Sequence, residues 1–355
     1  MVFVNQYSPH IQGRDAIGNN IRALRKMFEE LGYQSDLFHG AREEHPTAQK
    51  IERYTERNNA SSSLLIHYSM DDPKLDLLRS LPGKKTLIYH NITPPEFFQN
   101  DWPEVAEACR KGREKLSTFK DWIDCAIGIT DYNFAELERA GIDKIFRVPL
   151  LIDFSQYNAP ANPTIAAELM KDDTISWLFV GRVLAHKKQD DLIRVFHYYQ
   201  KYINPRSRLN LVGAENSNLW YTRYIEKLIK HLDVRDVTFT GSISQKDLLA
   251  YYRHSDIFLC LSEHEGLCVP IIEAMLSDLP IIAYDAAAIR ETLGHGGVLI
   301  KEKRFAEIAE LSHYILQHSQ LKSDLSLGQK ERLEKFSTDK VREGWRKVLN
   351  YIDSL

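Results

Sequence analysis

The sequence predicts an α/β protein with two doubly wound domains, each built on a parallel sheet. Short apolar runs, typical of buried strands, alternate with segments of helical periodicity along the whole chain. A strand, a glycine-containing loop and a helix open the chain, and the same pattern restarts near residue 175. At 355 residues the chain is long enough for two domains that each have a core.

The composition is that of a soluble globular protein. Charged residues make up 27% and hydrophobic residues 43%, and the net charge of −3 gives no general attraction to nucleic acid. The four cysteines form no CxxC pair, so we expect reduced, mostly buried thiols. No leader pattern or apolar run near 18 residues is present in the printed sequence, so we expect a cytoplasmic protein.

Residues 1–156 are expected to form the first domain. Its apolar runs predict strands, and its helical periodicity predicts helices that end at glycines or begin at capping residues. The expected strands are 2–7, 63–68, 85–90, 125–130 and 145–153, and the expected helices are 21–31, 102–120 and 131–141.

Residues 157–173 contain prolines, asparagines and alanines without a sustained apolar run, so they are expected to be a linker. Residues 174–338 are expected to form the second domain. Its expected strands are 175–180, 209–213, 237–243, 257–261, 281–285 and 298–300. Apolar residues recur at helical spacing over 341–352, which predicts a final helix.

The stretch 262–275 is the strongest functional signal in the chain. The apolar run 257–261 leads into two acids and Gly266, and Pro270 then suits the start of a helix. Such a turn directs backbone N–H groups and a helix dipole at the space above the sheet, which suits phosphate. Glu265 and Glu273 are eight residues apart, so we expect them to contact different parts of one ligand. The alternative is a solvated loop acid at Glu265 and, at Glu273, a first-turn acid that the helix dipole favours.

Two cations follow the strand that begins the second domain. Arg182 comes directly after Gly181, and Lys187 lies five residues further on, before the next helix. A guanidinium fork and an ammonium at the carboxyl end of a strand are suited to hold a diphosphate. Ordinary surface charge is the alternative.

His67 and His90 both lie at the carboxyl ends of predicted strands, where ligands of open α/β sheets bind. His90 is followed by a proline-containing loop, which suits a fixed polar group. We therefore expect a functional role for His90. A satisfied structural histidine is the alternative, and it is favoured for His67.

These motifs resemble one known family. The block Glu-Gly-x-x-x-Pro-x-x-Glu-Ala-Met at 265–275, the following 280–283 strand and Gly-Arg-x4-Lys at 181–187 resemble the retaining glycosyltransferases of family 4. Together with 89–94, the central block looks most like bacterial mannosyltransferases of polysaccharide assembly. Cys268 and Lys188 are departures, because many members carry glycine at these two positions.

The resemblance implies the GT-B fold, in which two Rossmann-like domains face a central cleft and the last helix, here 339–355, crosses back to the first domain. It also implies roles for individual residues. His90 and Glu265 would contact the sugar, Arg182 and Lys187 the diphosphate, and Glu273 the ribose. The other implied donor-binding residues are Gly13, Asp15, Gly241, Ser242, Ile243, Gly266, Leu267, Cys268 and Val269. A plain strand-to-helix turn is the alternative for the loop that holds Gly13 and Asp15.

The implied reaction moves a sugar from a nucleotide-sugar to a glycan or lipid-linked polysaccharide acceptor with retention of configuration. GDP-mannose is the first donor expected, and UDP-sugars come next. The family precedent is front-face transfer, in which the leaving phosphate takes the proton of the acceptor. No Asp-x-Asp and no His/Cys cluster with zinc spacing occurs, so we expect no metal and no cofactor.

Other functions are weighed against this one. A dinucleotide-dependent oxidoreductase would need the G-x-G-x-x-G fingerprint, which the sequence lacks. A non-catalytic nucleotide-sugar-binding or scaffold protein is disfavoured by the intact charged residues of the motifs. The helix with Arg22, Arg25 and Lys26 is expected to be solvated, with peripheral contact at the inner face of the membrane as the alternative. The sequence predicts neither the acceptor nor the oligomeric state.

Overall fold

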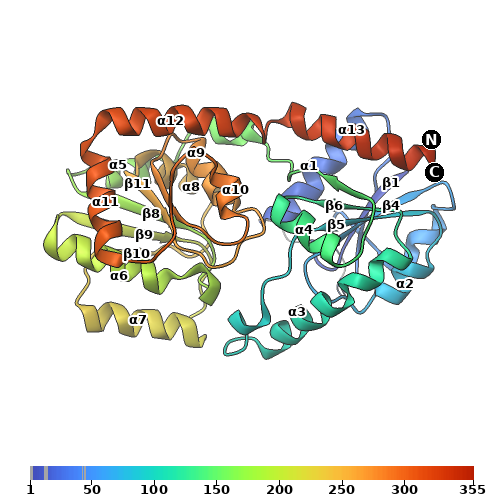
Figure 1. Cartoon of the computed structure of the whole chain (residues 1–355), viewed down its shortest axis with the longest axis horizontal. Helices are drawn as coiled ribbons and strands as arrows, with labels where there is room; N and C mark the ends of the chain where they lie inside the picture. The colour runs from blue at the N-terminus through green and yellow to red at the C-terminus, as the bar shows by residue number, and fades with distance from the viewer. Residues whose placement is uncertain (1–2, 12–14, 42, 44) are drawn as a thin grey trace. The chain divides into compact units, whose positions relative to one another are not determined.

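The computed structural model describes residues 3–11, 15–41, 43 and 45–355 and divides the chain into two compact units (Figure 1). Unit 1 comprises Met1–Pro95, Glu104–Asp153 and Lys335–Leu355, and unit 2 comprises Glu96–Pro103 and Phe154–Glu334. No helix among the described residues is both long enough and apolar enough to cross a bilayer.

The described residues of unit 1 form a seven-stranded parallel sheet in the order β3-β2-β1-β4-β5-β6-β7. The strands are β1 (Val4–Ser8), β2 (Leu37–His39), β3 (Gln49–Lys50), β4 (Ser63–Tyr68), β5 (Lys84–Tyr89), β6 (Cys125–Gly128) and β7 (Ile145–Arg147). The helices are α1 (Ala16–Glu30), α2 (Leu75–Ser80), α3 (Pro103–Lys115), α4 (Asp131–Arg139) and α13 (Thr338–Ser354), with 3-10 turns at Ile51–Glu56 and Leu116–Asp121.

Helix α13 packs within unit 1 although it lies at the far end of the sequence. The ring of Trp345 meets that of Phe28 on α1 edge to face, with centroids 5.0 Å apart. Tyr33 also donates a hydrogen bond to Asp353, and Arg342 pairs with Glu30 at 2.6 Å. The last helix of the chain therefore packs against the first helix of unit 1.

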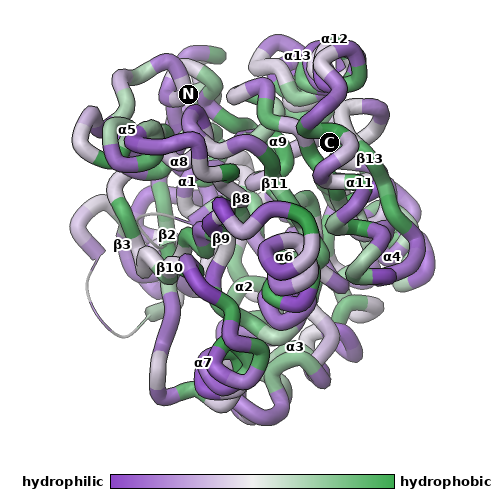
Figure 2. The backbone as a smooth tube through the Cα atoms, turned by 90° about the vertical axis from the view of Figure 1, so that its left-hand side faces the viewer, coloured by the Kyte–Doolittle hydropathy of each residue, from purple (hydrophilic) through white to green (hydrophobic). Residues whose placement is uncertain are grey.

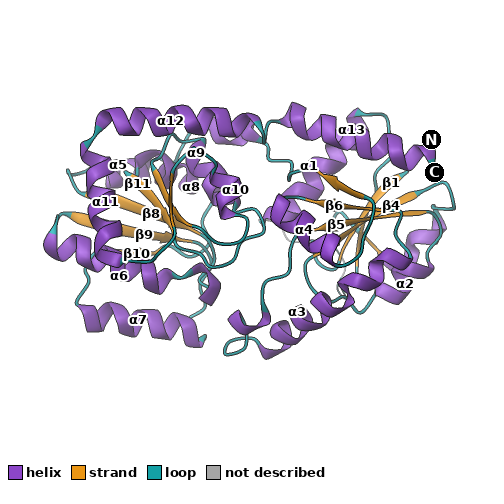
Figure 3. Cartoon of the chain, in the orientation of Figure 1, coloured by secondary structure: helices purple, strands orange, loops and turns teal. Residues whose placement is uncertain are grey.

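The described residues of unit 2 form a six-stranded parallel sheet in the order β10-β9-β8-β11-β12-β13 (Figure 3). Its strands are β8 (Ile175–Val180), β9 (Ser207–Val212), β10 (Val237–Phe239), β11 (Ile257–Cys260), β12 (Ile281–Tyr284) and β13 (Val298–Ile300). Its helices are α5 (Pro163–Leu169), α6 (Gln189–Tyr202), α7 (Trp220–Leu232), α8 (Gln245–His254), α9 (Val269–Met275), α10 (Ile289–Leu293), α11 (Phe305–Gln317) and α12 (Ser319–Glu334), with 3-10 turns at Pro95–Phe97, Phe154–Asn158 and Ala185–Lys187.

Both faces of the unit 2 sheet are buried, because successive strand residues point to opposite sides. Trp177 and Phe179 of β8 belong to the core beneath α6, α7 and α11, whereas Leu178 belongs to the core beneath α8, α9 and α10. Figure 2 shows hydrophilic and hydrophobic positions alternating along α6 and α7, as expected for helices that cover a sheet with one face. The prediction of two parallel-sheet α/β domains is confirmed.

The stretch predicted as a linker, 157–173, is instead partly helical. Helix α5 begins after Asn162, whose side chain accepts a hydrogen bond from the N–H of Thr164, and Pro163 occupies its first turn. Ala166 and Leu169 are buried, and Asn162 also donates to Asp247 at 2.7 Å. Proline and asparagine here act as helix-start signals, so the linker assignment is wrong for 163–169.

The strand order places one topological switch point in each sheet. In unit 1 the order reverses between β1 and β4, and in unit 2 between β8 and β11. Ligands of doubly wound sheets bind beyond the carboxyl ends of the strands at such points. The loops that follow β8 and β11 carry Lys187 and Glu265, and β1 and β4 carry Gln6 and His67.

Candidate functional site

Lys187 and Glu265 form a shielded ion pair at the switch point of unit 2. The Nζ atom of Lys187 lies 2.6 Å from Oε1 of Glu265, and their side chains are 16% and 9% exposed. Burial disfavours the charged ammonium, but the neighbouring acidic groups, Glu265 foremost, outweigh burial and raise the pKa of Lys187. A cation is therefore fixed above the sheet, and one carboxylate oxygen of Glu265 is already used to hold it.

The loop after Glu265 presents backbone N–H donors. Two carbonyl groups in this region accept hydrogen bonds from residues 288–292. The N–H of Ala288 donates to the carbonyl of Glu265 at 3.2 Å, and the hydroxyl of Thr292 donates to the carbonyl of Leu267. In the described part of the chain, the N–H groups of Leu267, Cys268 and Val269 have no hydrogen-bond partner. Three free donors beside an ammonium suit an anionic ligand.

Both positions where family members often carry glycine have a left-handed backbone. Lys188 has φ 54° and ψ 43°, and Cys268, the N-cap of α9, has φ 62° and ψ 64°. Glycine adopts such angles without steric strain, whereas other residues do so at a cost of about 1–2 kcal/mol. The two departures therefore keep the backbone turn and add a side chain. That of Lys188 reaches Asp190 at 3.4 Å.

Arg182 follows the end of β8 with an exposed side chain. Its guanidinium pairs with no acidic group among the residues that the structure describes, so it is free to contact a ligand. Its backbone is fixed, since its carbonyl accepts a hydrogen bond from Gln189 at 2.9 Å. The structure therefore leaves Arg182 available at the same strand end that positions Lys187.

The strand ends around Arg182 come unusually close together. The N–H of Gly213 donates to the carbonyl of Gly241 at 3.2 Å, and a Cβ atom at Gly213 would lie 2.3 Å from the carbonyl oxygen of Gly181. Gly241 itself has φ +66° and open space where a Cβ would be. In the predicted base-binding turn, Ser242 is exposed and Ile243 is half-buried.

Glu273 has a different environment from Glu265. Both of its carboxylate oxygens accept hydrogen bonds, Oε1 from Tyr157 and Oε2 from Tyr252, the latter at 2.7 Å. Burial raises the pKa of Glu273, and the two hydroxyl donors offset part of this rise. The two glutamates therefore have separate partners in the protein. Sequence patterns did not reveal Tyr157, which lies 116 residues from its partner.

Lys303 is a second residue that the sequence did not single out. Its Nζ lies 2.8 Å from Asp191 at the start of α6 and 2.8 Å from Glu263 in the loop after β11. The N–H of Glu263 also donates to the carbonyl of His186 at 2.8 Å. Lys303 thus ties together the two loops that carry Lys187 and Glu265.

In unit 1, His90 ends a buried chain of hydrogen bonds that starts at Gln6. The amide Nε2 of Gln6 donates to the carbonyl of Ile21 at 3.0 Å, so its Oε1 must accept from His67 Nε2 at 3.1 Å. His67 then carries its proton on Nε2, and its Nδ1 accepts from His90 Nε2 at 2.7 Å. This leaves Nδ1 of His90 as an acceptor, and it has no hydrogen-bond partner among the described residues.

Both histidines are neutral. Burial lowers the pKa of His90 to about 3 and lowers that of His67 well below its usual value. Nδ1 of a neutral His90 can accept a hydrogen bond but cannot donate one, and the atom is buried in this structure. The left-handed Asn91 that follows donates to Glu136 at 2.7 Å, and this contact fixes the loop after His90.

The structure describes Asp15 of the first loop. Gly13 lies outside the described residues. Asp15 is the N-cap of α1, and its side chain accepts a hydrogen bond from the N–H of Gly18 at 2.6 Å. This is the structural role that a plain strand-to-helix turn requires.

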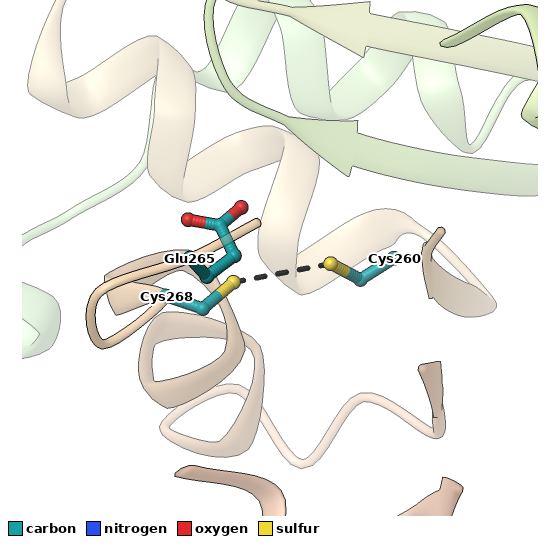
Figure 4. Close-up of side chains that lie close together, drawn as sticks. All are labelled: Cys260, Glu265 and Cys268. Carbon is teal, nitrogen blue, oxygen red and sulfur yellow. Dashed lines mark hydrogen bonds between the residues drawn. The ribbon is translucent and has the colours of Figure 1, made fainter. Parts of the chain in front are cut away.

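Three side chains in the described part of the chain are close enough together to bind one metal ion. The sulfur atoms of Cys260 and Cys268 and a carboxylate oxygen of Glu265 are all within 4.8 Å of one another (Figure 4). Thiolates and a carboxylate would suit a soft divalent cation such as Zn²⁺. Lys187, however, already supplies a positive charge to Glu265.

Comparisons with known proteins agree on one class. Residues 163–332 match the family model described as "Glycosyl transferases group 1". An uncharacterized glycosyltransferase of Haemophilus influenzae is 29% identical over 190 residues, which are 51% of this chain and 51% of that protein. The chain thus matches about half the length of this curated relative.

Two solved structures resemble the whole chain. A sucrose-phosphate synthase from Thermosynechococcus elongatus superposes with a TM-score of 0.78 at 17% identity, and 99% of each chain is covered. Anabaena HepE in complex with UDP-glucose superposes with a TM-score of 0.77 at 15% identity, covering 98% of this chain and 99% of that one. At these identities the likeness shows the fold, which is GT-B.

Proposed function

We propose that this chain, whose residues 163–332 match the family model of the group 1 glycosyl transferases, moves a sugar from a nucleotide-sugar donor to a glycan or lipid-linked acceptor with retention of configuration. One observation carries the proposal. A shielded Lys187–Glu265 pair lies beside three unpartnered N–H donors at the switch point of the unit 2 sheet. This arrangement provides fixed positive charge where a diphosphate leaving group would develop negative charge.

The costly part of the transfer is cleavage of the bond between the anomeric carbon and the diphosphate oxygen. Arg182, Lys187 and the N–H groups of the 267–269 loop stabilise the departing diphosphate, and one preorganised donor of this kind is worth about 3 kcal/mol. No additional base is required when the leaving phosphate takes the proton of the acceptor hydroxyl. Glu265 keeps Lys187 charged and offers its second oxygen to the sugar.

The remaining residues orient the donor and the acceptor. Glu273 exchanges a tyrosine hydroxyl for the ribose diol, since both are hydrogen-bond donors to a carboxylate. The backbone of Gly241, Ser242 and Ile243 contacts the base. His90 accepts a hydrogen bond at Nδ1 from a substrate hydroxyl. The reaction is proposed to be independent of metal.

Two candidate donors differ in the base of their nucleotide. The central motif resembles those of mannosyltransferases, which favours GDP-mannose. The structural neighbour HepE is in complex with UDP-glucose, which supports a UDP-sugar instead. The acceptor proposed is a growing polysaccharide or its lipid carrier. Peripheral contact to anionic lipid through the basic face of α1 is the alternative to a solvated helix face.

A thermal-shift panel with GDP, UDP, ADP, dTDP and NAD, without added metal, tests the proposal. A ligand present at 100 times its dissociation constant adds about 2.7 kcal/mol of stability. A selective shift with one nucleoside diphosphate is expected and identifies the base. A shift with NAD alone would favour the oxidoreductase alternative. If the protein binds donor but never releases nucleoside diphosphate with any acceptor, it is a non-catalytic binding protein.

A further inference from the structure

Cys260 and Cys268 lie on either side of the loop that carries Glu265, and their sulfur atoms are in contact. Cys260 ends β11, Cys268 caps α9, and their sulfur atoms lie 3.9 Å apart (Figure 4). Both residues are buried, at 1% and 5% exposure, and both are free thiols. The proposed reaction uses only the backbone of Cys268, so it gives neither sulfur a role.

The backbone at Cys268 is a second, independent observation. Its φ of 62° is left-handed, a conformation that glycine would adopt with less strain. Non-glycine residues with strained backbone cluster at functional sites. The side chain of Cys268 adds one thiol to the site, and that thiol contacts the sulfur of Cys260.

We propose that Cys260 and Cys268 form a reversible disulfide under peroxide and that this bond closes the donor site. In the overall step both S–H bonds and the O–O bond of hydrogen peroxide break, one S–S bond forms and two waters leave. Each sulfur loses one electron, and the peroxide oxygens take up both electrons and both protons. The effect on donor binding rests on the proposed function, whereas the formation of the bond does not.

The geometry explains why the bond would disturb the site. A disulfide is about 2.05 Å long, so the two sulfurs must approach by about 1.9 Å from their separation of 3.9 Å. Figure 4 shows the sulfurs facing each other across the loop. Strand β11 is paired on both sides, with β8 and β12, so it resists displacement. The approach therefore falls on the Cys268 loop, which shifts the 267–269 N–H groups from the positions they hold in the reduced protein.

The full-length protein is first reduced and treated with a chelator, and then exposed to hydrogen peroxide. Peptide mapping by mass spectrometry should find 260 and 268 joined, with the loss of two hydrogens. The affinity for whichever nucleoside diphosphate the reduced protein binds should fall by about tenfold or more, equivalent to about 1.4 kcal/mol. Dithiothreitol should restore it. Saturating nucleoside diphosphate should slow the cross-link, because it covers the same loop.

Two variants control for other oxidation. Cys260→Ser should bind nucleotide like the wild type and keep that affinity after peroxide. Cys125→Ser removes a matched buried thiol from a strand of unit 1. It should leave the sensitivity of nucleotide binding to peroxide unchanged. The absence of a 260–268 cross-link in the wild type would overturn the proposal, and so would equal peroxide sensitivity of Cys260→Ser. If the cross-linked protein binds the nucleoside diphosphate as well as the reduced protein does, the proposal that the disulfide closes the donor site is wrong.

Failure of this inference can be told apart from failure of the proposed function. If the cross-link forms but the reduced protein binds no nucleoside diphosphate, the disulfide stands and the transferase proposal fails. If the reduced protein binds nucleotide and the cross-link never forms, only the disulfide is refuted.

Discussion

Nε2 of His90 lies 2.7 Å from Nδ1 of His67, and this hydrogen bond determines what His90 can do. Because Gln6 orients His67, the proton of His90 is held on Nε2 and its Nδ1 is left as an acceptor. A histidine at the end of a strand can be an acid, a base or a simple acceptor. The buried chain from Gln6 leaves Nδ1 able to accept a hydrogen bond, which is the role proposed for His90.

Replacing His90 with alanine should slow sugar transfer more than it weakens nucleotide binding. One lost hydrogen bond to a substrate hydroxyl corresponds to about 1–1.5 kcal/mol, so kcat should fall by about tenfold. Steady-state kinetics and calorimetry with the nucleoside diphosphate measure the two effects separately. An unchanged kcat would assign His90 a purely structural role. His231→Ala, at an exposed position, is the matched control.

The buried histidines should make the protein sensitive to mild acid. The folded pKa of His90 is about 3, below the unfolded value of about 6.5, so the unfolded chain binds the proton first. This contribution to stability is complete above pH 6.5 and is lost as the pH falls toward 3. At pH 5 the loss from His90 amounts to about 2 kcal/mol. Urea unfolding at pH 7 and pH 5 should therefore show a smaller pH effect in His90→Gln, whose amide still donates to His67. His231→Gln should behave like the wild type.

Lys187→Met should lower both donor affinity and stability. The loss of a charge-assisted contact to the diphosphate should weaken binding by about tenfold to a hundredfold. The carboxylate of Glu265 is also left buried without its partner, at a cost of about 3 kcal/mol in unfolding free energy. Adding Glu265→Gln should recover part of the stability without recovering the binding. A single variant that binds donor normally would show that the diphosphate site is elsewhere. Lys227→Met, on the exposed face of α7, is the control.

Glu273→Gln should reduce the preference for ribose. An amide nitrogen cannot accept the hydrogen bonds that a carboxylate oxygen accepts, so one contact to the diol is lost. Affinity for the ribonucleoside diphosphate should fall by about tenfold, while that for the 2′-deoxy analogue should change little. Competition calorimetry with both ligands measures the difference. Equal losses for the two analogues would argue for a general structural effect. Glu226→Gln is an exposed control.

Lys303→Met should raise the KM for the donor several-fold with a smaller change in kcat. Lys303 contacts no proposed substrate-binding residue directly. It joins Asp191, at the start of the helix that follows Lys187, to Glu263, in the loop that carries Glu265. Lys303→Arg should restore most of the affinity because it can reach both carboxylates. Lys301→Met, two residues away and exposed, should have no effect. If Lys301→Met and Lys303→Met behave alike, the contacts of Lys303 with Asp191 and Glu263 have no role in donor binding.

The sequence predicted the sheets well where burial imposes a pattern. Strand β4 is buried at every position, so its apolar run was recognisable, whereas the three-residue β2 was too short to stand out. The site was predicted as far as local motifs extend. The contacts of Glu273 with Tyr157 and of Lys303 with Asp191 join residues 116 and 112 positions apart, and no local periodicity encodes such pairs.

The position of α13 has a consequence for biosynthesis. Phe28 and Glu30, near the start of the chain, meet their partners Trp345 and Arg342 only after more than three hundred further residues have been translated. Residues 154–334 of unit 2 are contiguous, so most of that unit can fold while unit 1 still lacks its last helix. The unit that leaves the ribosome first is thus the last to be completed. Until then the face of α1 that carries Phe28 lacks its covering helix and exposes apolar surface that chaperones can bind during synthesis.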